Sequence, residues 1–154
     1  MTIGPEPRIR TLEGLSVTLD LSYIYANLQD VDEDAQRWVE FARTDLRMAG
    51  LALEHRLRSQ CVFHCQQAIE KMLKSIWVDR KDIGMPPRTH ELPRLARTLA
   101  LKLEEDDLRF LQALSEQYLP SHYADFEVEY PEEAASFYLE RTAAIYEWLH
   151  QQLS

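Results

Sequence analysis

Two cysteines and a histidine lie close together in the middle of the sequence and are the first candidates for chemistry. Cys61 and Cys65 are four residues apart, and His64 lies between them. Thiolates and imidazole nitrogens are typical zinc ligands, and a structural zinc site needs four of them. On a helix His64 lies about 100° round from Cys65, and no fourth ligand is nearby. We therefore predict no metal and no cofactor, and interpret the cysteines as small buried residues in a reducing cytoplasm.

The element that must position these residues is the run 61–78, whose apolar residues recur with a helical period. The apolar stripe is broad, so several other helices must cover it, and we expect this helix at the centre of a bundle. The stripe contains Cys61, Cys65, Ile69, Met72 and Ile76. The opposite side is polar, and we interpret it as solvated surface: Gln66, Gln67, Glu70, Lys71 and Lys74.

Composition limits the classes of protein that the chain can belong to. With 154 residues, 45% of them hydrophobic, it suits one globular domain. The net charge of -9 argues against a general nucleic-acid binder. It leaves room for a small basic pocket, or for RNA held in a cleft between subunits. The sequence shows no signal-peptide pattern and no apolar run of about 18 residues, so we expect a cytoplasmic protein without a membrane segment.

The first thirty residues have a different pattern from the rest. Between Leu15 and Tyr25 the side chains alternate between apolar and polar almost strictly, which is typical of a strand with one buried face. Glu13-Gly14 could form the turn of a hairpin whose first strand is 8–12. We expect residues 1–30 to form a short β-hairpin or extended segment; a poorly ordered tail is the alternative.

Residues 31–154 are expected to form an all-α, antiparallel up-and-down bundle of about five helices. The expected helices cover about 34–55, 58–82, 91–103, 104–119 and 131–154. On the first helix the predicted inward face contains Trp38, Phe41, Ala42, Asp45, Ala49 and Ala52, with Leu46 and Leu53 beside it. On the last it includes Tyr138, Ile145, Arg141 and Trp148. Asp45 is unusual there: either it lies at the margin of the stripe, or a cation from another helix pairs with it.

Several motifs, taken in chain order, resemble the HEPN domain (higher eukaryotes and prokaryotes nucleotide-binding). The most specific is Gln-Gln-Ala-x-Glu-Lys-x-Leu-Lys at 66–74. The resemblance covers about 34–153, and its other motifs are Ala42-x-x-Asp45-Leu46, Phe63-His64-Cys65, Thr89-His90-x-Leu92, Leu114-x-x-x-Tyr118 and Glu133-Ala134.

The resemblance implies a helical bundle, usually a homodimer, in a prokaryotic toxin–antitoxin or defence system. It also implies a possible partner, a separately encoded minimal nucleotidyltransferase. Many members are metal-independent ribonucleases with an Arg-x(4–6)-His motif, in which histidine serves as acid or base and arginine stabilises the charge of the phosphate.

This sequence departs from that catalytic pattern. Arg58 and His64 form the only pair with the required spacing, but they lie at the start of the second helix, whereas the motif of catalytic members comes later. We interpret the spacing as chance, so Arg58, His64 and His122 stay weak catalytic candidates. After the fourth helix, where similar members usually have Arg-Tyr-Pro-Asp, this chain has His122-Tyr123-Ala124-Asp125.

Three functions follow as hypotheses. The first is a dimeric, non-catalytic component that binds a nucleotide, RNA or a partner. Its expected pocket contains Lys71, Lys74, Tyr118, His122, Tyr123 and Asp125. The second is a ribonuclease that uses His64 or His122 with an arginine (Arg58, Arg88 or Arg141). The third is an interaction protein whose N-terminal strands mediate assembly.

Overall fold

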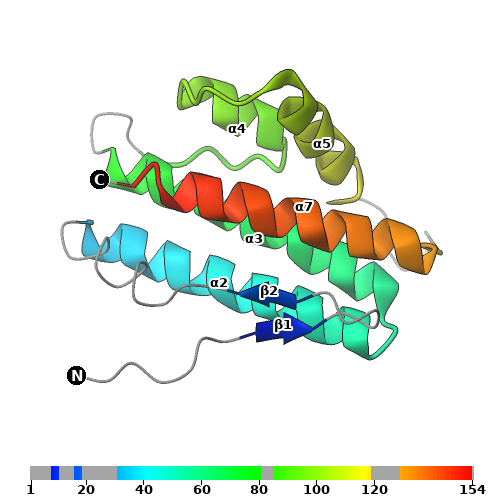
Figure 1. The fold of residues 1–154 in the computed structure, drawn as a ribbon. Helices are drawn as coiled ribbons and strands as arrows, with labels where there is room; N and C mark the ends of the chain where they lie inside the picture. The colour runs from blue at the N-terminus through cyan, green and yellow to red at the C-terminus, as the bar shows by residue number, and fades with distance from the viewer. Residues whose placement is uncertain (1–7, 11–15, 19–30, 81–84, 119–128, 154) are drawn as a thin grey trace, which may run out of the picture.

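The computed structural model describes residues 8–10, 16–18, 31–80, 85–118 and 129–153 (Figure 1). Within these ranges it contains two short strands and a helical bundle. The helices are α2 (Glu33–Glu54), α3 (Arg58–Asp79), α4 (Leu92–Thr98), α5 (Glu105–Glu116) and α7 (Glu132–His150). The prediction of an all-α bundle of about five helices is confirmed. Helix α4 is shorter than expected, and α3 ends three residues before the predicted residue 82.

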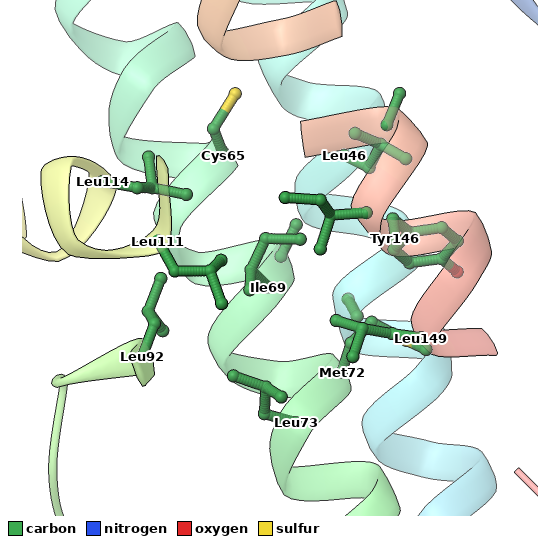
Figure 2. Packing of buried hydrophobic residues seen from close by; sticks show 14 of the residues in the cluster. Leu46, Cys65, Ile69, Met72, Leu73, Leu92, Leu111, Leu114, Tyr146 and Leu149 are labelled. Atoms are coloured by element: carbon green, nitrogen blue, oxygen red, sulfur yellow. The ribbon is translucent and has the colours of Figure 1, made fainter. Parts of the chain in front are cut away.

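Helix α3 is the centre of the bundle, as its broad apolar stripe predicted. It packs against α2 along one side, against α7 along another, and against α4 and α5 on a third (Figure 1). Ile69 illustrates this position, because it lies among Leu46 of α2, Leu111 of α5 and Tyr146 of α7 (Figure 2). All four side chains are fully buried. Burying side chains from four elements in one cluster is what holds these helices together.

The inward face of α2 agrees with the prediction in part, because Ala42, Asp45, Ala49 and Ala52 are buried as expected. Phe41 was expected inside, but its exposed fraction is 58%. The buried residues recur at alternating steps of four and three, which is the seam of two closely packed helices. They are Ala35, Val39, Ala42, Leu46, Ala49 and Leu53. Alanines at this seam let α2 approach α3 closely, so the large rings of Trp38 and Phe41 are left at its edge.

The inward face of α7 was also predicted wrongly in part. Ile145 is buried as expected, but Arg141 is not in the core: its Nη2 lies 2.5 Å from Oδ1 of Asp107 on α5. The buried face instead includes Ala135, Leu139, Thr142, Ala143, Tyr146 and Leu149. Apolar residues occur on nearly every side of this helix, so its period alone does not identify the inner one.

Near the N-terminus the described residues form two short strands, β1 (Arg8–Arg10) and β2 (Ser16–Thr18). They pair antiparallel, with Ile9 opposite Val17. Most of the predicted hairpin, including its turn and the stretch 19–25, lies outside the described residues. The hairpin and the domain division at residue 30 therefore stay predictions.

Candidate functional site

Two carboxylates are buried between the helices. Asp45 of α2 is 7% exposed, and Glu70 of α3 is 5% exposed. Removing a charged carboxylate from water is costly unless hydrogen-bond donors and a cation replace the water. The side chains that surround these two groups therefore define the most constrained polar region of the bundle.

Asp45 is held by two basic side chains of α3. Its Oδ1 lies 2.8 Å from Nδ1 of His64, and its Oδ2 accepts a hydrogen bond from Nζ of Lys71. His64 and Lys71 are seven residues apart, so both project from one face of α3. Burial alone would raise the pKa of Asp45, but the hydrogen bonds from His64 and Lys71 outweigh it, and the pKa lies below its ordinary value. Asp45 is thus paired with a cation of another helix, Lys71, which was one of the two interpretations left open by the sequence.

The ionised carboxylate also determines which tautomer His64 adopts. A carboxylate only accepts hydrogen bonds, so Nδ1 of His64 must donate and carry the proton. In the neutral ring Nε2 then has the lone pair, on the side of the ring away from Asp45. This is the arrangement in which a histidine can accept a proton or a hydrogen bond from a ligand.

Glu70 is surrounded in a similar way. It accepts hydrogen bonds from Nε2 of Gln66 at 2.9 Å and Nζ of Lys74 at 2.5 Å, and lies 2.9 Å from Nδ1 of His90. Burial would raise the pKa of Glu70, but these bonds hold it below its ordinary value. His90 in turn stacks on Tyr118, with ring centroids 3.6 Å apart and planes 14° from parallel. Through His90, Glu70 connects α3 to the segment before α4 and to the end of α5.

Aromatic rings of α2 lie beside the two lysines. Nζ of Lys71 is 5.9 Å from the ring centre of Phe41, and Nζ of Lys74 is 5.8 Å from that of Trp38. Cations at this distance are attracted to the electron-rich face of a ring. We call the whole surface the lysine–histidine face, and it consists of Trp38, Phe41, Asp45, His64, Glu70, Lys71, Lys74 and His90.

The structure brings part of the predicted pocket together. Lys71 and Lys74 both lie on the lysine–histidine face, and Tyr118 adjoins it through His90. Asp45, Glu70 and His90 were not among the predicted site residues. The sequence signal that could have identified Glu70 and His90 was their place in two HEPN motifs, 66–74 and Thr89-His90. The predicted residues His122, Tyr123 and Asp125 lie outside the described residues.

One interpretation of the central helix was wrong. Gln66 and Glu70 were expected on a solvated surface, but they are 1% and 5% exposed. The carboxylate of Glu70 can be buried because Lys74, one turn further on, folds back onto it.

Arg58 and His64 do not converge. Nη1 of Arg58 lies 3.4 Å from the carbonyl oxygen of Tyr130, and its Nη2 lies 3.8 Å from Glu132 at the start of α7. Six residues along a helix correspond to a rotation of about 240°, so His64 faces α2 instead. Within the described residues, this pair does not form an arginine–histidine site.

The two cysteines are buried and carry free thiols, as the sequence predicted. Burial raises the pKa of the Cys65 thiol well above its ordinary value. In the part of the chain that the structure describes, no group of three or more His, Cys, Asp or Glu side chains could hold a metal ion.

The buried carboxylates predict how stability depends on pH. Their folded-state pKa values are lowered, so each contributes its full stabilisation above its unfolded pKa of about 4, and loses it as the pH falls through the folded value. Urea unfolding measured from about pH 6 down to about pH 3 should show decreasing stability below about pH 4. Asp45→Asn should show a shallower decrease, whereas Asp34→Asn, at an exposed carboxylate, should follow the unmodified protein. Parallel curves for all three would contradict the assignment.

The fold and this face define a small α-helical domain in which two buried carboxylates hold a row of basic side chains. The model of the HEPN domain matches residues 35–152, and the chain belongs to this family. The resemblance seen in the sequence motifs is therefore confirmed.

Among solved structures, the chain is similar to the crystal structure of TT1696 from Thermus thermophilus. The two are 25% identical, with a TM-score of 0.69, over 79% of this chain and 100% of that one. A search of curated proteins finds no match. None of the described helices is long and apolar enough to span a membrane.

Proposed function

We propose that this HEPN domain binds a nucleotide or single-stranded RNA on its lysine–histidine face, as a dimeric component of a prokaryotic toxin–antitoxin or defence system. The observation that carries the proposal is an exposed aromatic ring next to fixed cations. The ring of Phe41 is 58% exposed, and Nζ of Lys71 lies 5.9 Å from its centre. Proteins that bind single strands stack bases on such rings and hold the phosphates with nearby cations.

The pairing of the lysines with carboxylates is compatible with this role. A lysine ammonium has three donors, so a bond to Asp45 or Glu70 leaves others for a phosphate oxygen. The carboxylates also reduce the local positive charge, so binding would be modest and sensitive to salt. The chain's net charge of -9 agrees with recognition by a small local site and not by a broad basic surface.

The proposed partner rests on family membership. Members often act beside a minimal nucleotidyltransferase, and such an enzyme is the partner we propose. We also propose that the domain acts without catalysis, because Arg58 is bound near the start of α7 and does not lie beside His64.

Removing the exposed ring should weaken nucleic-acid binding without weakening the fold. We expect Phe41→Ser to raise the Kd for a fluorescein-labelled oligoadenylate at least about fivefold, because stacking of one base contributes about 1–3 kcal/mol. Fluorescence anisotropy would measure it, with thermal unfolding to check the fold. Phe137→Ser, at a ring that is 54% exposed on another face, is the matched control. Equal binding by all three proteins, or no binding by any, would reject the proposed site.

The orientation of His64 favours a second candidate, a metal-independent ribonuclease in which Nε2 acts as the base. We expect instead that a mixed RNA pool stays intact when incubated with the protein in EDTA. Gel electrophoresis would compare the unmodified protein with His64→Ala and His122→Ala. Cleavage that either substitution abolishes would show that the domain is an enzyme.

A further inference from the structure

A groove between α5 and α7 lies apart from the lysine–histidine face. Its volume is about 510 Å³, and its walls are mainly apolar: Phe110, Ala113, Ala134, Phe137 and Tyr138. Phe137 is 54% exposed, and its ring meets that of Phe110 edge-on at 5.9 Å. An exposed aromatic side chain beside an apolar groove is typical of a binding surface, and Phe137 is in this position.

The arginines at this groove are already neutralised by carboxylates. Arg109 pairs with Glu105 at 2.6 Å and with Asp106 at 3.5 Å, and Arg141 pairs with Asp107 at 2.5 Å. A phosphate that reached either guanidinium group would lie beside these carboxylates, whose negative charge repels it. The arginines therefore give the groove little attraction for phosphate.

Further carboxylates lie near the same groove. The pKa of the Tyr138 phenol is raised, first by burial and next by the negative charge of Glu116, which therefore lies close to it. Glu133 and Glu140 lie one helical turn before and after Phe137, and so project from the same side of α7. Asp106, Arg109 and Arg141 line the groove, and with Glu105 and Asp107, which pair with the arginines, and Glu116, which lies near Tyr138, the carboxylates of this rim outnumber its guanidinium groups.

We propose that this groove docks a basic amphipathic helix of a partner protein. Apolar side chains at i, i+3 or i+4, and i+7 would lie in the groove, against Ala113, Ala134 and Phe137, as in other helix-in-groove complexes. Lysine and arginine on the flanks of that helix would meet the carboxylates of the rim. The acidic rim disfavours RNA and anionic lipid, and a second copy with a net charge of -9 is repelled overall.

The test uses a fluorescein-labelled peptide of leucine and lysine, with leucines at helical spacing, and the full chain. We expect saturable binding by fluorescence anisotropy, weakened roughly tenfold by Phe137→Ser, because a buried aromatic anchor carries much of the energy of an interface. Glu116→Lys and Glu140→Lys should also weaken it. Met48→Ser, at an exposed apolar residue of α2, should bind as the unmodified protein does, and circular dichroism would check each fold.

Three results would overturn the proposal. The first is equal binding by the Phe137→Ser protein, or no saturable binding by any variant. The second is equal binding of a peptide with glutamate in place of each lysine, because the rim would then have no electrostatic role. The third is a dimer, seen by light scattering, that Phe137→Ser converts to a monomer, because the occupant would then be a second copy.

Discussion

Glu70→Ala should lower the free energy of unfolding by about 3 kcal/mol, because removing one member of a buried ion pair leaves its partners desolvated and unpaired. Glu70 is 5% exposed, and the side chain of Lys74 is 13% exposed. The substitution would also leave Gln66 and His90 without an acceptor. Urea unfolding followed by circular dichroism at neutral pH would measure the change.

The chain contains a matched control for this prediction. Glu105 and Arg109 form another glutamate–cation pair four residues apart on a helix, but their side chains are 79% and 70% exposed. Glu105→Ala should change stability by less than about 0.5 kcal/mol, as solvent already screens the pair. If both substitutions had the same small effect, the carboxylate of Glu70 would not be structurally required.

Ile69→Ala should be at least as destabilising, by about 3–4 kcal/mol, because it removes buried methyl groups and leaves a cavity where α2, α3, α5 and α7 meet (Figure 2). For a domain of this size the melting temperature should fall by about 10 °C. Differential scanning calorimetry would give both the melting temperature and the enthalpy. Ile69 and Glu70 are consecutive and therefore about 100° apart round the helix, so the two predictions test two different faces of α3.

Ile69→Val and Leu51→Ala serve as controls for the cavity. Ile69→Val removes one methylene and should cost about 1 kcal/mol. Leu51 is 42% exposed, so truncating it should cost less than Ile69→Ala. Comparable losses for Ile69→Ala and Leu51→Ala would mean that Ile69 is not at the centre of the core.

The sequence predicted the helices well, but on two of them it identified the inward side only in part. Phe41 of α2 and Arg141 of α7 were assigned to the core, and neither lies there. Hydrophobic periodicity scores a large ring and an alanine alike, whereas close packing of two helices selects small residues at the seam. The seam of α2 is built on Ala42 and Ala49, and the size of those side chains was the missing criterion.

The sequence by itself determined that the run 61–78 is a central helix, because its apolar residues keep a period of 3.6 over several turns. It also contained the motif at 66–74 that places the chain in the HEPN family. Only the tertiary structure decided that the polar side of this helix is partly buried. Asp45 is 26 residues from Lys71 in sequence, and Glu70 is 20 residues from His90. Such pairs form only when α2 and the segment before α4 pack against α3, because no local rule of helix spacing joins residues that far apart.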